Sequence, residues 1–366
     1  MHCRAPMAFH LLLAAVAVAT SVRAADTIAA DVSRVVDTYL AGPVKERTFS
    51  GVVLVAKDGK PLHRKAYGLA DEVQGVPNTP DTGFMIFSVT KQFTAALILR
   101  LQDRGKLSVN DPVTKYFAEW PKPWEKVTIH HLLTHSSGIE VDSQYFWLVK
   151  HYPEFWEDKS KSPPPFEMKA LLSEPGTRFR YSNAGYTVLT LIAAKAGGKP
   201  YADLIRAELF QPLGMARTGF AGAMPPPARA RGYRLTNGAP ELSEQKTIDI
   251  VGAGDAVTTV DDLLKWDEAL YGDALLSSAA RKAMFTPFVP GKNGSFGYGW
   301  LVRESAPGRS LQLFSGSGAG FAAYVIRVPE EHLYVAVLCN RESEGPFPHG
   351  LGVLDAARVV LNGTKR

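Results

Sequence analysis

The pattern of hydrophobic and polar residues predicts strands near both ends of the chain and helices between them. Residues 50–56 and 61–67 are rich in β-branched side chains, and Lys57-Asp58-Gly59-Lys60 joins them with a typical hairpin signal. Four later segments also have the composition of strands separated by turns: 298–302, 311–315, 322–328 and 333–339. We therefore expect a sheet built from distant parts of the chain.

Helical spacing of apolar residues predicts the other elements. An amphipathic helix is expected at 28–40, and a largely buried helix should begin at Ser88 and end at Gly105. Two more helices are predicted at 260–271 and near 351–361, the last of them covering the sheet. Between Asp111 and about Arg231 the sequence is helix-like, rich in loops and interrupted by prolines.

These elements predict an α/β (α+β) sandwich, in which helices flank an antiparallel sheet made of N- and C-terminal strands. The sandwich domain should comprise residues 25–110 and 245–366. An inserted, mostly helical domain should comprise residues 111–244.

The first 24 residues have the features of a secretory signal peptide. They carry basic residues, then an apolar run at 9–19, and end in Val22-Arg23-Ala24. The apolar run is too short to span a bilayer, and we predict a secreted, periplasmic protein without a membrane span. Cleavage would remove Cys3 and leave Cys339 as the only cysteine, buried as a small apolar residue and without a disulfide partner.

Charge and motif content argue against several classes of ligand. The net charge of +5 falls to about +3 when Arg4 and Arg23 are removed, and no basic run is interleaved with aromatics, so we expect no nucleic-acid partner. No glycine-rich phosphate loop opens a helix, and no cofactor is expected. His131 and His135 lack the glutamate of a zinc motif, so we predict no metal and interpret them as residues that anchor a loop. The expected partner is a small-molecule or peptide substrate.

Ser88-Val89-Thr90-Lys91 is an S-x-x-K tetrad at the start of the predicted buried helix. This spacing places the Ser88 hydroxyl and the Lys91 amine on one helix face, where they can share a proton. A desolvated lysine has a lowered pKa and can serve as the base that serine needs. A second tetrad begins at Ser243, but its polar surroundings favour an exposed loop.

Tyr181-Ser182-Asn183 is the only Y-x-N in the chain and lies where a loop enters a predicted helix. A phenol is a useful base only where a cation such as Lys91 stabilises the phenolate. Asn183 has both a donor and an acceptor, which suits it to hold an amide or the lysine. The alternative is an ordinary aromatic turn at a helix start.

With these motifs in place, the chain resembles the serine hydrolases built like class C β-lactamases, D-alanyl-D-alanine peptidases and related esterases. The resemblance extends from about Asp31 to Val359. It also rests on the segment 107–112, on 131–138, on Pro175-Gly176 and on Gly320-Phe321. It implies that Ser88 is the nucleophile, that Lys91 and Tyr181 form the general base, and that Asn183 orients the substrate or Lys91.

The resemblance also places a third wall of the site at Phe314-Ser315-Gly316-Ser317. The backbone N–H groups of Ser88 and Ser317 would form the oxyanion hole, and Phe314, Ser315 and Gly316 would contact the substrate. Family members usually have Lys or His where this chain has Phe314. A phenyl ring cannot pair with a substrate carboxylate, which disfavours penicillins and D-alanyl peptides.

We therefore predict a serine hydrolase that forms an acyl-enzyme on Ser88, with an ester ranked above a peptide or lactam as its substrate. The alternative is a non-catalytic, penicillin-binding-like protein that keeps the fold. Asp255 replaces the small residue usual in the family, and we expect it to cap a turn, with a place in the pocket wall as the alternative. Aromatic residues between 145 and 156 are candidates for the acyl pocket.

Overall fold

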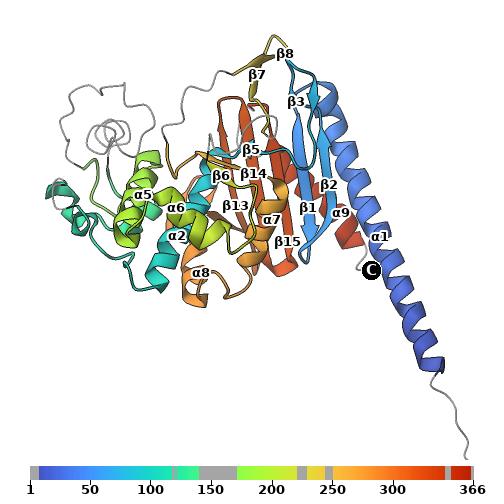
Figure 1. Ribbon diagram of the computed structural model, residues 1–366, viewed down its shortest axis with the longest axis horizontal. Helices are drawn as coiled ribbons and strands as arrows, with labels where there is room; N and C mark the ends of the chain where they lie inside the picture. Colours follow the sequence, from blue (N-terminus) through green and yellow to red (C-terminus); the bar gives the residue numbers. More distant parts are fainter. Residues whose placement is uncertain are drawn as a thin grey trace, which may run out of the picture.

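The computed structural model describes residues 8–117, 120, 122–139, 171–220, 229–243, 250–342 and 348–363, with side chains from residue 26 onward except at 348. Eight strands form one large sheet in the order β10-β11-β12-β13-β14-β15-β1-β2 (Figure 1). Their bounds are Val289–Gly291, Gly294–Phe296, Leu301–Ala306, Arg309–Gly318, Phe321–Val328, Leu333–Cys339, Gly51–Lys57 and Lys60–Tyr67.

Strands from the two ends of the chain lie side by side in this sheet, as predicted. β1 pairs with β15 in an antiparallel register that sets Gly51 opposite Cys339, and β1 and β2 form the expected hairpin. All neighbouring strands of the sheet are antiparallel. The predicted sandwich with an antiparallel sheet is therefore confirmed.

One predicted strand begins later than the sequence pattern indicated. The segment 298–302 was expected to be extended, but β12 begins only at Leu301. Gly299 has a φ of +76°, and a Cβ added there would lie 2.8 Å from the Lys91 carbonyl oxygen. The chain turns at Gly299 because it passes closely over the helix that carries Lys91.

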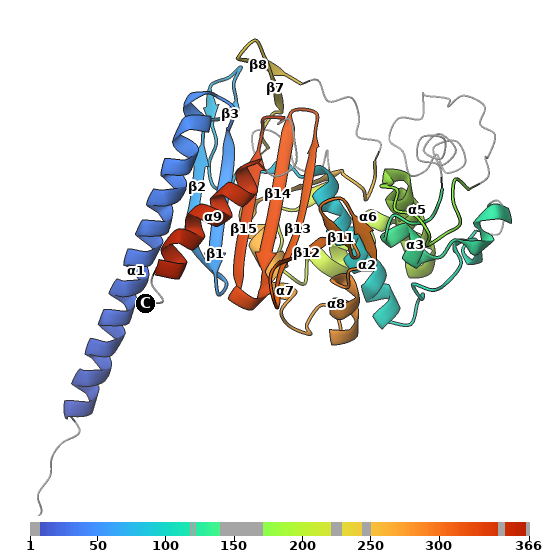
Figure 2. The ribbon, with the colours of Figure 1, turned by 180° about the vertical axis from the view of Figure 1, so that it is seen from behind.

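Helices cover both faces of the sheet. α1 (Ala8–Lys45) and α9 (Pro348–Gly363) pack together on one face, which Figure 2 shows in front. α7 (Val260–Ala269) packs on the opposite face against β1 and β15. The predicted helix 28–40 lies within α1, where Val32, Val36 and Leu40 form a buried stripe at helical spacing. Within the residues that are described, no helix is both long and apolar enough to cross a membrane.

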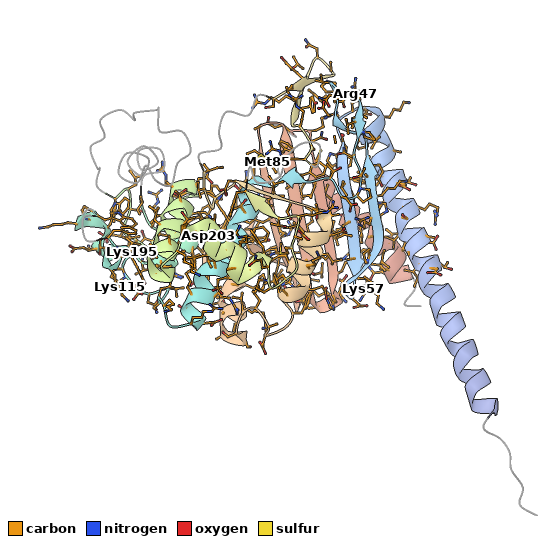
Figure 3. All side chains as sticks on the ribbon, viewed as in Figure 1. Arg47, Lys57, Met85, Lys115, Lys195 and Asp203 are labelled. Atoms are coloured by element: carbon orange, nitrogen blue, oxygen red, sulfur yellow. The ribbon has the colours of Figure 1, made fainter. Side chains whose placement is uncertain are left out.

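A second group of helices lies beyond the edge of the sheet, around α2 (Lys91–Asp103). Lys115 and Lys195 mark this region in Figure 3, whereas Lys57 lies at the opposite end, on β1. The described residues of the predicted insertion, 111–244, contain more helix than strand; its domain boundaries stay a prediction. The helices there are η2 (Val113–Lys115), η3 (Lys122–Lys126), α3 (Ile129–Leu133), α5 (Asn183–Gly197), α6 (Tyr201–Ile205) and η5 (Arg206–Phe210).

Short strands complete the fold, and three of them lead to the candidate site. β5 (Phe84–Met85), β9 (Ala256–Thr258) and β6 (Gly219–Phe220) form a small sheet in the order β5-β9-β6. β5 is followed directly by η1 (Phe87–Thr90). The remaining elements are β3 (Leu69–Asp71), β4 (Val76–Pro77), β7 (Tyr233–Thr236), β8 (Ala239–Leu242), α8 (Ser278–Met284) and η6 (Pro329–Glu331).

Candidate active site

Ser88 lies in η1, directly after the small sheet. Met85 pairs with Val257 of β9, and the Ile86 N–H donates to the Ala256 carbonyl at 3.0 Å. Phe87 then adopts a φ of +43°, which is costly for a residue with a large side chain. Packing holds this conformation, because the Phe87 ring is buried and lies against Phe321 of β14. The strained residue turns the chain so that Ser88 lies at the start of the helical segment.

Lys91 is the first residue of α2 and its side chain is fully buried. Its Nζ lies 3.1 Å from the Ser88 Oγ, 2.8 Å from the Asn183 Oδ1 and 2.7 Å from the Ala253 carbonyl oxygen. A neutral amine has two N–H donors and one lone pair. In this neutral form, Asn183 and Ala253 would accept from the two donors, which would leave the lone pair to face the Ser88 hydroxyl.

Burial acts against the charged forms of both Lys91 and Tyr181. Burial lowers the pKa of Lys91 well below its usual value, and the charge of Asp255 opposes this shift without cancelling it. Burial raises the pKa of Tyr181, while its hydrogen bond to Ser88 acts in the opposite direction. The Tyr181 hydroxyl donates to the Ser88 Oγ at 2.6 Å. Ser88 thus lies between a phenol that donates and an amine that can accept.

The loop that carries Tyr181 is fixed by a capped helix and by His135. The Ser182 Oγ accepts from the Gly185 N–H at 2.9 Å and caps α5, so the loop enters a helix here, as predicted, and the helix begins at Asn183. The His135 Nδ1 accepts from the Ser182 N–H at 3.1 Å, and its ring lies 4.5 Å from the Tyr181 ring. His131 accepts from the Thr128 N–H and completes the cap of α3. Both histidines therefore anchor local structure, as expected from the sequence.

β13 forms the third wall of the site, as predicted. A cavity of about 410 Å³ is lined by Ser88 and Tyr181 on one side and by the strand on the other. The β13 residues that line it are Phe314, Ser315, Gly316 and Ser317.

Five further lining residues were not predicted from the sequence: Phe179, Lys292, Asn293, Phe296 and Leu301. The Phe296 ring stacks on Phe179 at 4.3 Å and meets Phe314 edge-on at 6.4 Å. Phe179 is only two residues from Tyr181, which was a usable signal. Phe296 and Lys292 come from the β10–β11 hairpin, which reaches the cavity only through the pairing of the sheet, so no local pattern indicated them.

Gly316 allows β13 to approach the Ser88 backbone. A Cβ added at Gly316 would lie 2.5 Å from the Ser88 nitrogen and would collide with the Ile86 carbonyl oxygen. We expect Gly316→Ala to push β13 away from η1 and to lower kcat/KM by at least about 10²-fold, because a displacement of about 1 Å at a reacting group has this effect. Steady-state kinetics test this, with the melting temperature as a check on folding. Unchanged kinetics in the folded variant would contradict the close packing.

Two other sequence predictions agree with the structure, and two concern residues that the structure does not describe or describes only in part. Asp255 caps a turn as expected, since its Oδ1 accepts from the Gly252 N–H at 2.8 Å. Cys339 is buried in β15 and unpaired. The second tetrad, apart from Ser243, lies outside the described residues, as do the aromatics between 145 and 156.

Comparison with known proteins identifies the family. The family model described as Beta-lactamase matches residues 32–358. Penicillin-binding protein 4* of Bacillus subtilis (strain 168) is 28% identical over 338 residues, which cover 87% of this chain and 74% of that protein. Esterase EstB of Burkholderia gladioli is 34% identical over 216 residues, 54% of each chain.

A solved structure supports the same assignment. The octameric penicillin-binding protein homologue from Pyrococcus abyssi superimposes with a TM-score of 0.75 at 27% identity, covering 89% of this chain and 77% of that one. The family match spans both the sheet and the helices around Ser88. The chain therefore belongs to the β-lactamase family of serine hydrolases, which includes penicillin-binding proteins and esterases.

Proposed function

We propose that this protein hydrolyses a carboxylic ester through an acyl-enzyme on Ser88, with Lys91 as the general base. The observation that carries the proposal is the position of the Ser88 Oγ, 3.1 Å from the Lys91 Nζ and 2.6 Å from the Tyr181 hydroxyl. A base and a second proton carrier within hydrogen-bond reach of a hydroxyl are what nucleophilic catalysis by serine requires.

In the proposed reaction, the Ser88 Oγ attacks the substrate carbonyl carbon while its proton passes to the Lys91 amine. The carbon–oxygen bond to the alcohol then breaks, and the alcohol leaves with a proton from Tyr181, which Lys91 replaces. A water molecule attacks the acyl-enzyme by the same route in reverse and releases the acid. Because the pKa of Lys91 is lowered and that of Tyr181 is raised, Lys91 is the acceptor and Tyr181 the donor in the resting site.

Backbone donors are proposed to stabilise the oxyanion that forms during attack. Ser88 and Ser317 both line the cavity, from η1 and from β13. Main-chain N–H groups aimed at the developing charge do this without depending on nearby side chains. The replacement of a usual Lys or His by Phe314 would therefore leave acyl transfer itself intact.

The apolar lining of the cavity supports an ester with an apolar acyl group. Phe179, Phe296 and Phe314 form connected aromatic contacts along the lining. Phe314 is buried, and its ring offers no charge to a carboxylate. The name of the relative EstB is consistent with this class of substrate.

A second candidate is a substrate that carries a carboxylate, such as a penicillin or a D-alanyl peptide. Lys292 lines the same cavity and is the only charged side chain among the lining residues that the structure describes. A cation on the β10–β11 hairpin would supply the charge that Phe314 does not. The names of several relatives, including penicillin-binding protein 4*, favour this candidate.

Two assays separate the proposals. Hydrolysis of p-nitrophenyl esters would support the first, and a stable adduct or turnover of benzylpenicillin, followed by intact mass, would support the second. A serine-directed fluorophosphonate tests both against a non-catalytic binding protein, because it labels only an activated serine. Absence of labelling at Ser88 would refute every hydrolytic proposal.

Phe314→His is expected to shift the preference between these substrates. A cationic or hydrogen-bonding ring at this position should raise the rate of acylation by benzylpenicillin about tenfold and lower kcat/KM for a p-nitrophenyl ester, since one charge-assisted hydrogen bond is worth about a factor of ten. Phe314→Leu keeps the wall apolar and should leave benzylpenicillin acylation unchanged. If the histidine and leucine variants acylate equally, Phe314 does not control carboxylate recognition.

We also propose that residues 1–24 direct export and are removed. N-terminal sequencing of protein recovered from the periplasm of an expressing cell tests this, with Ala25 expected as the first residue.

A further inference from the structure

The turn at residues 251–254 is attached to the two helical segments that carry Ser88 and Lys91. The Lys91 Nζ donates to the Ala253 carbonyl at 2.7 Å, and the Thr94 Oγ1 donates to the Gly252 carbonyl at 2.6 Å. The Thr90 Oγ1 accepts from the Ala256 N–H at 3.1 Å. The turn therefore supplies a fixed acceptor to the amine and is held in place by the neighbouring threonines.

Asp255 closes this turn from inside the protein. Its side chain is 6% exposed, and its Oδ1 accepts from the Gly252 N–H at 2.8 Å. Gly252 has a φ of +69°, and a Cβ there would collide with Thr190, so the turn has little freedom to change shape. Asparagine or serine can cap a turn in the same way without the cost of burying a charge. The choice of an acid needs a further reason.

Several titratable groups surround Lys91, and among those that the structure describes Asp255 is the acid that interacts with it. The Tyr181 and Tyr186 rings lie 4.8 and 5.5 Å from the Nζ, and burial raises the pKa of both phenols. His135 is kept neutral, because burial and then Lys91 lower its pKa. Asp255 acts on Lys91 in the opposite direction from burial and is the one acid that does so among the described residues.

A second titratable group interacts with the Asp255 side chain. Tyr201, at the start of α6, has its pKa raised by burial and then by Asp255. Burial raises the pKa of Asp255 itself to about 7, while Lys91 acts to lower it. The carboxyl group of Asp255 and the amine of Lys91 therefore act on each other's pKa. They do so in the pH range in which Lys91 would have to accept a proton.

We propose that Asp255 is a positioning residue for Lys91: its carboxyl group closes the turn that holds the Ala253 carbonyl against the buried amine, and it is the acidic partner of that amine. The inference rests on the proposed role of Lys91 as the base for Ser88. It assigns to residue 255 a part in the reaction without contact with the substrate.

Asp255→Asn removes the negative charge but keeps the hydrogen bond that closes the turn. The amide oxygen still accepts from Gly252, but the negative charge that favours protonated Lys91 is gone. Lys91 should then stay neutral to lower pH, and the acid limb of the pH–rate profile should move to lower pH by about one unit. We would measure the rate of Ser88 labelling by a fluorophosphonate between pH 4 and 9, because this single step forms the oxygen–phosphorus bond, expels fluoride and passes the serine proton to the base.

Asp262→Asn is the matched control. Asp262 is also buried, in the same stretch of chain, but accepts from the Arg217 N–H at 2.8 Å and the Thr218 Oγ1 at 2.9 Å, away from Lys91. Its variant should keep the acid limb of the unmodified protein. Melting temperatures show that each variant is folded, and Asp255→Ser, which also caps the turn with a neutral oxygen, replaces Asp255→Asn if the latter is not.

The outcomes distinguish this inference from the function on which it rests. An acid limb that moves to lower pH only in the residue 255 variant supports the inference. An unchanged limb in that variant, with Ser88 still labelled, overturns the inference and leaves the hydrolase proposal standing. Failure of the unmodified protein to be labelled at Ser88 refutes the proposed function instead.

Discussion

Ser88→Ala is expected to abolish labelling by a fluorophosphonate and to lower kcat/KM for a p-nitrophenyl ester by about 10³-fold or more. The nucleophile and its base act as a unit, so loss of the hydroxyl removes the covalent route and leaves only binding and oxyanion stabilisation. The change should have little effect on the fold. It removes one acceptor from the Tyr181 hydroxyl, which costs about 1–3 kcal/mol at most.

Ser243→Ala is the matched control, because Ser243 begins the second S-x-x-K tetrad of the chain. Within the part of the chain that the structure describes, its one hydrogen bond runs from the Ser243 N–H to the Gly232 carbonyl, and alanine keeps this bond. Labelling and kinetics should match those of the unmodified protein. Labelling that survives in Ser88→Ala and disappears in Ser243→Ala would move the nucleophile to the second tetrad.

The sequence predicted the elements that depend on local patterning. β15 has the predicted bounds, and α5 begins at Asn183 after a serine cap, because a continuous apolar run and a capping residue act over a few positions. The S-x-x-K spacing also predicted that Ser88 and Lys91 would meet, since it is a property of one helical turn. Local rules were sufficient for this part of the site.

Long-range contacts could not be read from the sequence. The Ala253 carbonyl, which accepts from Lys91, lies 162 residues further along the chain and is brought there by the pairing of β5 with β9. Phe87 has a positive φ that no propensity indicates, because tertiary packing imposes it. The predicted strand at 298–302 was wrong in its first residues for the same reason, as Gly299 turns over α2.

Arg327→Met is expected to lower the free energy of unfolding by about 3–5 kcal/mol, because it leaves a buried carboxylate without its partner. The Arg327 Nε donates to the Asp267 Oδ1 at 2.6 Å, and the two side chains are 2% and 0% exposed. This ion pair joins β14 to α7, and the guanidinium also donates to the Gln312 Oε1 at 2.9 Å. Urea unfolding at pH 7 would measure the loss.

Two further variants test the physical reason for that loss. Asp267→Leu combined with Arg327→Met removes both charges and should recover most of the stability, because an apolar pair of similar volume is often as stable as a buried ion pair. Arg234→Met breaks an ion pair with Glu342 in which the arginine is 62% exposed, and should cost less than about 1 kcal/mol. A loss below about 1 kcal/mol in Arg327→Met would show that Asp267 is not left as a buried charge.

The loss should depend on pH with a defined sign. Burial raises the pKa of Asp267 from 3.8 to about 6 in the intact pair, while Arg327 acts to lower it. Without Arg327 the folded-state pKa rises further, so above about pH 6 the folded variant holds a proton that the unfolded chain releases. The free energy of unfolding of the variant then keeps falling as the pH rises, after that of the unmodified protein has levelled off. The difference between the two should therefore be larger at pH 8 than at pH 5, and a difference that shrinks over this range would contradict the assignment to Asp267.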